Sequence, residues 1–133
     1  MKFRLHPLGC AALMSLLWLA GCANPALREA DKLAHQGQHE AALARLQQSL
    51  DQRDEDQAVR TAWLKQRDTT VAHLVYLADA ARASGRLDDV ESVLIRLERA
   101  APNHPRSVWL RSEVDRLKRH QRLMQEAQQA MTD

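Results

Sequence analysis

Two histidines and a glutamate stand close together in this sequence, and such side chains could bind a metal ion. His35 and His39 lie four positions apart and Glu40 follows directly, and imidazole and carboxylate are ligands that Zn²⁺ takes in proteins. Two histidines at this spacing share one face only when the helix between them is unbroken. Gly37 stands between them and is typical of a helix end. We therefore predict no metal site here and no bound cofactor.

The other chemically active side chains form no catalytic arrangement. His73, His104 and His120 have no ligand-type residue at a suitable spacing, and the chain lacks both a Gly-x-Ser-x-Gly turn and a glycine-rich phosphate loop. Its adjacent carboxylates, at residues 54–56 and 88–89, fall at predicted helix starts, where negative charge interacts favourably with the helix dipole. We expect no enzymatic activity. An enzyme with unfamiliar motifs is kept as an alternative.

Cys22 has the spacing of a modified residue. Leu-Ala-Gly precedes it at residues 19–21, at the end of an apolar run that follows Lys2 and Arg4. That run is too short for a stop-transfer helix. The pattern resembles the lipobox of bacterial lipoproteins, in which diacylglycerol is attached to the cysteine sulfur and the new amino terminus is acylated. The resemblance implies a signal peptide over residues 1–21 and a lipidated Cys22.

The same resemblance implies a location. Several acyl chains hold a protein in a bilayer because each buried methylene contributes about 0.8 kcal/mol. Ala23 follows the cysteine, whereas an aspartate there resembles the inner-membrane retention signal of enterobacterial lipoproteins. We therefore expect one mature domain, residues 22–133, anchored in the outer membrane and facing the periplasm. An ordinary signal peptide with a chance cysteine is the alternative.

The expected mature domain has no net charge and no pair of cysteines. The chain has 19 Lys and Arg against 17 Asp and Glu, and removal of Lys2 and Arg4 with the signal leaves 17 of each. Nucleic-acid binding needs an excess of basic side chains, so we do not expect it. Cys10 lies in the signal and Cys22 at the anchor. No disulfide is predicted, and apolar packing must hold the domain together.

Apolar side chains recur at helical spacing through the mature chain, and the alternation typical of strands is missing. Glycine, proline and charged stretches delimit helices over residues 26–36, 39–50, 57–84 and 87–101, and from Pro105 towards Met131. The third helix either continues through Asp68 or restarts there. The predicted fold is all-α, with antiparallel hairpins and a long C-terminal capping helix. Trp63 is expected in the core, whereas the burial of Trp109 is left open.

Two segments of the mature chain repeat each other without a gap. Residues 37–46 and 85–94 both begin with glycine, and a small or branched residue and a leucine follow five and nine positions later. These spacings resemble the tetratricopeptide pattern, which implies pairs of antiparallel helices that pack at a small residue. The glycines are 48 residues apart, whereas the family repeats about every 34. We therefore expect an insertion of about 14 residues between Leu50 and Val71.

At a finer level, residues 64–68, 78–87 and 102–106 are similar to the amino-terminal repeat region of a lipoprotein-type secretin, the outer-membrane gate of type II secretion and type IV pilus systems. The resemblance implies a scaffold that binds other protein subunits, a secretin among them. The gate-forming domains are not in this sequence, so we expect either the product of a truncated or split secretin gene or a free-standing adaptor related to that region. The alternative function is a pilotin-like or outer-membrane assembly lipoprotein that guides a client.

The last predicted helix carries the expected partner-binding residues. Its packing stripe consists of Leu110, Val114, Leu117, Gln121, Met124, Gln128 and Met131. Because two of the seven are glutamine, we expect part of this stripe to be exposed or covered by another molecule. The helix is also rich in basic residues, and such a run is usually a solvated helix surface. The functional alternative is that the basic residues meet an acidic partner, a neighbouring subunit or anionic lipid. The candidates are Arg111, Arg116, Lys118, Arg119 and Arg122.

Overall fold

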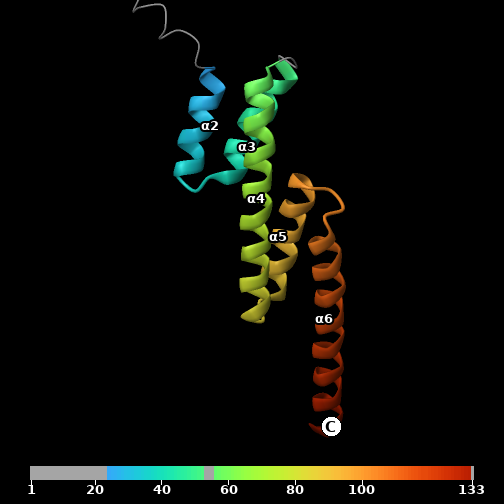
Figure 1. Cartoon of the computed structure of the whole chain (residues 1–133). Coiled ribbons are helices and arrows are strands. Elements are labelled where there is room, and N and C mark those ends of the chain that lie inside the picture. The colour runs from blue at the N-terminus through green and yellow to red at the C-terminus, as the bar shows by residue number, and fades with distance from the viewer. Residues whose placement is uncertain (1–23, 53–55, 133) are drawn as a thin grey trace, which may run out of the picture.

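The computed structural model describes residues 24–52 and 56–132, which form five helices and no strand. The helices are α2 (Pro25–His35), α3 (His39–Gln52), α4 (Gln57–Ala83), α5 (Leu87–Ala100) and α6 (Pro105–Thr132). Successive helices run antiparallel, and the described part of the chain is elongated, with the start of α2 and the end of α6 at opposite ends (Figure 1). The structure thus confirms an all-α fold of helical hairpins with a long C-terminal helix.

Local chemistry explains where the helices begin and end. The side-chain oxygen of Asn24 accepts a hydrogen bond from the amide of Ala26 at 2.9 Å, which caps α2. Asp56 caps α4 by accepting from the amide of Val59 at 3.1 Å. Gly37 and Gly85 close α2 and α4 with φ of 74° and 70°. Glycine enters this left-handed region without the steric cost that a Cβ brings.

The helix α4 is continuous, which answers the question left open at Asp68. Thr69 and Thr70 do not cap a new helix, because their hydroxyls donate to the carbonyls of Lys65 and Gln66, at 3.1 and 2.8 Å. Such bonds to the preceding turn satisfy the hydroxyls without interrupting the helix. The helix α4 is therefore a single helix of 27 residues. Its first half packs against the hairpin formed by α2 and α3, and its second half forms a hairpin with α5.

Two apolar cores lie along α4. The first, between α2, α3 and the start of α4, buries Ala30, Ala42, Leu46 and Val59. The second joins the end of α4 to α5 and the first half of α6, and it buries Leu74, Ala78, Ala81, Leu87, Val90, Val93, Leu94, Leu97, Leu110 and Val114. The second core is larger and contains most of the buried leucines. Because α4 contributes to both cores, it couples the two hairpins.

The helices repeat with one register. The helices α3 and α5 begin at His39 and Leu87, 48 residues apart, and end at Gln52 and Ala100, again 48 apart. The helices α4 and α6 begin at Gln57 and Pro105, also 48 residues apart. The expected insertion is therefore the added first half of α4, and α6 has the same added length. The added length of α4 is therefore part of a 48-residue repeat, and it does not interrupt a shorter repeat at a single place.

The junction between the hairpins is held by polar contacts. The carbonyl of His39, at the start of α3, accepts from Gln66 Nε2 at 3.1 Å, and Thr70 Oγ1 lies 3.2 Å from the same oxygen. Next to it, Arg96 Nε of α5 donates to both oxygens of Glu40 at 3.1 Å. This hydrogen bond lowers the pKa of Glu40 below its ordinary value. These bonds fix α3 against both α4 and α5.

The prediction that Trp63 is buried in the core is wrong, because the structure shows it partly exposed. Its indole packs against the first core but is only half-buried, and the guanidinium carbon of Arg67 lies 5.2 Å from its ring centroid. The physical reason is the stagger of the hairpins, since α3, α4 and α5 meet at Trp63 and leave a groove over it. Trp63 lines this groove and is not enclosed in the core.

Candidate functional site

The helix α6 is attached to the body by its first half only. Ser107, Leu110 and Val114 are buried and Leu117 is partly buried against the second core. Every side chain from residue 119 to residue 132 is exposed, and this half of the helix extends beyond the ends of α4 and α5 (Figure 1). The expectation that part of the stripe is exposed is confirmed. The two glutamines of that stripe lie in the exposed half.

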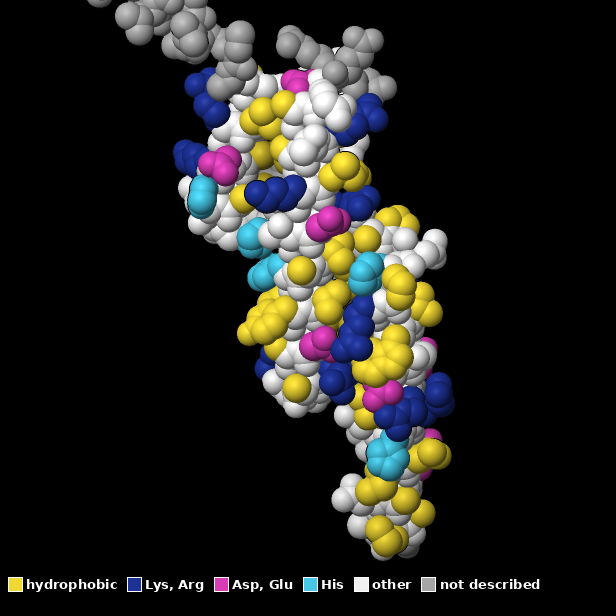
Figure 2. All heavy atoms as spheres, viewed as in Figure 1, with side chains coloured by type: hydrophobic (Ala, Val, Ile, Leu, Met, Phe, Trp, Pro, Cys, Tyr) yellow, Lys and Arg dark blue, Asp and Glu magenta, His cyan; other side chains and the backbone are white. Residues whose placement is uncertain are grey.

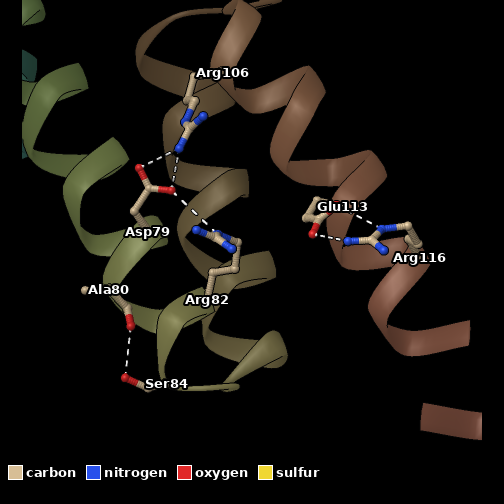
Figure 3. A network of polar contacts seen from close by, with 7 residues as sticks. All are labelled: Asp79, Ala80, Arg82, Ser84, Arg106, Glu113 and Arg116. Carbon is tan, nitrogen blue, oxygen red and sulfur yellow. Dashed lines mark hydrogen bonds and ion pairs between the residues drawn. The ribbon is translucent and has the colours of Figure 1, made fainter. Parts of the chain in front are cut away.

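A charged network fixes the attached half of α6 to α4 (Figure 3). Arg106 Nη2 donates to both carboxylate oxygens of Asp79, at 2.7 and 2.9 Å. The guanidinium of Arg106 also lies 4.2 Å from the ring centroid of Trp109, and that of Arg82 lies 5.7 Å from it. Trp109, left open by the sequence, is 43% exposed. The face of its ring makes cation–π contacts with both guanidinium groups.

Three of the five basic candidates pair within the chain. Lys118 Nζ lies 2.9 Å from carboxylate oxygens of both Asp88 and Glu91. The hydrogen bond to Glu91, and after it the one to Asp88, raises the pKa of Lys118 above its ordinary value. Arg116 lies 2.6 Å from Glu113, and its hydrogen bond lowers the pKa of that carboxyl group. The third pair joins Arg111 to Glu98 at 3.8 Å.

Arg119 and Arg122 differ from the other three candidates. Both are exposed, and neither has an acidic partner within the described residues. They lie in the unattached half of α6, where Glu126 is the one carboxylate between residue 119 and the end of the helix. Among the five candidates, Arg119 and Arg122 are therefore the two whose charge no carboxylate of the described chain pairs.

Apolar side chains lie beside these arginines. Figure 2 shows hydrophobic atoms gathered at the far end of α6. Leu123 is 63% exposed, Met124 57% and Met131 79%. At 3.6 residues per turn, these three side chains share one side of the helix with Ala127 and Ala130. We call these five residues the tail stripe. Its leucine and methionines are large apolar groups that no part of the described chain covers.

Grooves on the hairpin stack provide further surface. A groove of about 420 Å³ lies between α2 and α4, lined by apolar residues such as Leu27 and Ala30, with Arg28 and Lys65 at its edge. A second groove, of about 310 Å³, lies over Trp63 where α3, α4 and α5 meet. Both are open and mostly apolar. They have the shape to receive single side chains of another protein.

The histidines are arranged differently from what their spacing suggests. His35 lies 3.5 Å from Asp31 on its own helix, while the ring of His39 packs against that of His73, with centroids 4.9 Å apart. The contact between His39 and His73 was missed because 34 residues separate them in the sequence. Within residues 24–52 and 56–132, no group of three or more His, Cys, Asp or Glu side chains could hold a metal ion.

The lipidation residue Cys22 and the whole signal peptide lie outside the described residues. Among the helices that the structure describes, none is long and apolar enough to cross a membrane. Because Cys22 is not among the described residues, its lipidation stays a prediction from the sequence.

No family model matches this chain, and neither a curated protein nor a solved structure matches it. The function proposed below depends on the sequence pattern and on the geometry of the helices.

Proposed function

We propose that this chain is a lipid-anchored scaffold of the outer membrane that faces the periplasm and binds other proteins, within a secretin-based secretion or pilus system. The observation that carries the scaffold role is the unattached half of α6, which the hairpin stack holds clear of its own core. Large apolar side chains kept in water in this way are typical of a surface for another protein.

The path of the chain is compatible with an anchor at Cys22. The first helix begins at Pro25, three positions after that cysteine, and the unattached half of α6 lies at the opposite end of the described residues (Figure 1). A lipid at Cys22 would hold the start of α2 near the bilayer. Confinement of the scaffold to the membrane raises its effective concentration for a partner in the same place.

The choice of a secretin as partner has a separate basis. It depends on the resemblance of residues 64–68, 78–87 and 102–106 to the repeat region of a lipoprotein-type secretin. The hairpin stack is compatible with that resemblance, because both consist of paired antiparallel helices. A client of a pilotin-like lipoprotein would use the same kind of surface, so the identity of the bound protein decides between the two.

The test compares the native chain with Cys22→Ser in cells that express each at the same level. Intact-mass spectrometry should find a triacylated mature chain from the native form alone, and fractionation should place that form in the outer membrane. Crosslinking from membranes should then recover secretin components with the native form. An unacylated native chain, or equal release of both forms into the soluble fraction, contradicts the anchor. Recovery of a transported client in place of the secretin favours the guiding function.

A further inference from the structure

We propose that residues 119–132 of α6 are a helical ligand, which inserts the tail stripe into an apolar groove, edged by acidic side chains, on a second periplasmic protein. This inference deepens the proposed scaffold role and rests on it. It assigns the binding surface to one segment of the chain. It also names the chemistry of the site that receives this segment.

The 48-residue register shows that the hairpin stack cannot continue along this segment in the same way. In α2 and α4, the positions that face the following helix are small or aliphatic, namely Ala26, Ala30 and Leu33, and Leu74, Ala78 and Ala81. The equivalent positions of α6 are Arg122, Glu126 and Gln129. A further hairpin helix packed at this face would bury an arginine and a glutamate, which costs several kcal/mol per unpaired charge. This face of α6 therefore ends the stack.

The apolar surface lies on another side of the same helix. The tail stripe spans an arc of about 120°, since successive residues are about 100° apart. It is turned by about a third of a rotation from the buried side that carries Leu110 and Val114. Leu123, Ala127 and Ala130 follow the i, i+4, i+7 spacing of helices that bind in grooves. Met124 and Met131 lie together along one side of these three, with flexible side chains that adapt to the shape of a groove.

Charge defines the edge of the groove that would receive the stripe. Arg119 and Arg122 lie beside it without an acidic partner in the described chain, whereas Arg111, Arg116 and Lys118 are paired with carboxylates of this protein. Carboxylates on the partner would pair with the two arginines and steer the encounter. An acidic edge therefore complements this segment.

A second copy of this chain is a poorer occupant than a groove. Two crossed tails would contact each other through five side chains each, and two of the five are alanine. Such a contact falls well short of the roughly 1,000 Å² that a specific interface buries. A groove encloses the helix on three sides and so covers more of each side chain.

The membrane is a poorer occupant as well. Clusters that bind anionic lipid contain about four to eight Lys or Arg, whereas two unpaired arginines and Glu126 lie in this segment. The segment also lies at the end of the molecule opposite the start of α2, away from the proposed anchor (Figure 1).

The test is site-specific photo-crosslinking of the full-length chain in its own host. A photoreactive phenylalanine analogue replaces Met124 or Met131 on the stripe, or Gln125 or Gln129, which are also exposed but lie on other sides of α6. We expect one discrete protein adduct from the two stripe positions and at least tenfold less from the two glutamine positions. Arg119→Glu with Arg122→Glu should reduce that adduct at least tenfold while circular dichroism shows unchanged helix content. Mass spectrometry should place the crosslink among apolar residues flanked by Asp or Glu.

Each other outcome overturns the inference. These outcomes are an adduct between two copies of this chain, an adduct to phospholipid, equal labelling at all four positions, and no adduct at any of them. Failure of the anchor is distinguishable from failure of the ligand. A stripe-specific adduct from a chain that proves unacylated would refute the anchor alone, whereas an acylated outer-membrane chain without stripe-specific adducts would refute the ligand alone.

Discussion

Leu110→Ala tests how α6 is attached to the body. Leu110 is fully buried in the second core, between α6 and the helices α4 and α5. Removal of a buried leucine costs the transfer free energy of the lost carbons and leaves a cavity, for a total of about 2–5 kcal/mol. With no exposed area at this side chain, we expect a loss of about 3 kcal/mol in the free energy of unfolding.

The assay is urea unfolding of the mature chain with Cys22→Ser, followed by circular dichroism. For a domain of this size the free energy of unfolding falls by roughly 2 kcal/mol per molar urea. The midpoint of Leu110→Ala should therefore move down by about 1.5 M. The matched control is Leu123→Ala, which removes the same atoms from the same helix and makes the same change in helix propensity. Because Leu123 is 63% exposed, we expect a change within about 0.5 kcal/mol.

The comparison isolates packing, since the two variants differ only in what surrounds the leucine. Equal destabilisation by the two substitutions would show that the unattached half of α6 is covered by this chain. A negligible effect of Leu110→Ala would show that α6 does not dock through the described side. Either result would refute the division of α6 into an attached and an unattached half.

Three further predictions concern the turn and the two ion-pair sites. Gly85→Ala should lower the free energy of unfolding by about 1–2 kcal/mol, because the φ of 70° is unfavourable for any residue with a Cβ. No atom lies within 4 Å of the added Cβ, so the cost comes from the backbone alone. A neutral result in urea unfolding would contradict this turn. Glu40→Gln should cost about 0.5 kcal/mol at pH 7, since the pair with Arg96 is partly exposed. Because the pKa of Glu40 is lowered from 4.5, its contribution is present above pH 4.5 and is lost as the pH falls through the lowered pKa; unfolding of wild type and variant from pH 7 to pH 3 should converge, and a constant gap would refute this. Arg106→Lys should shift the emission of Trp109 and cost about 1 kcal/mol, because lysine lacks the planar stacking group; fluorescence unchanged from wild type would exclude the stacking.

The sequence predicted most of the fold because the signals for it are local. Helical spacing of leucine and alanine, the turn glycines Gly37 and Gly85, and Pro105 in a first turn placed the helix ends to within a few residues. Asp68 was ambiguous for the same reason, since an acidic residue before two threonines caps a helix in one context and continues it in another. Contacts of α4 with α3 and α5 favour the continuous helix, and such contacts are not visible in a short window.

The candidate site was predicted only in part. Charge and spacing singled out the basic residues of the last helix, but they could not show that Lys118 meets Asp88 and Glu91, about 30 residues earlier. The role of Arg106 was also missed, because its partner Asp79 lies on a different helix. Ion pairs between distant segments depend on which helix faces are brought together.

Local signals in the chain were enough to predict an all-helical fold with a repeated turn-and-helix unit, because helix propensity, capping and periodicity act within about one or two turns. The sequence also carried the prediction of a lipid at Cys22. The packing of the helices was needed to show that α4 links two unequal cores and that α6 leaves the body halfway along its length. The physical reason is that burial is a property of the space between helices: the same spacing of apolar residues is core at Leu110, where α5 covers it, and surface at Met124, where nothing in the described chain does.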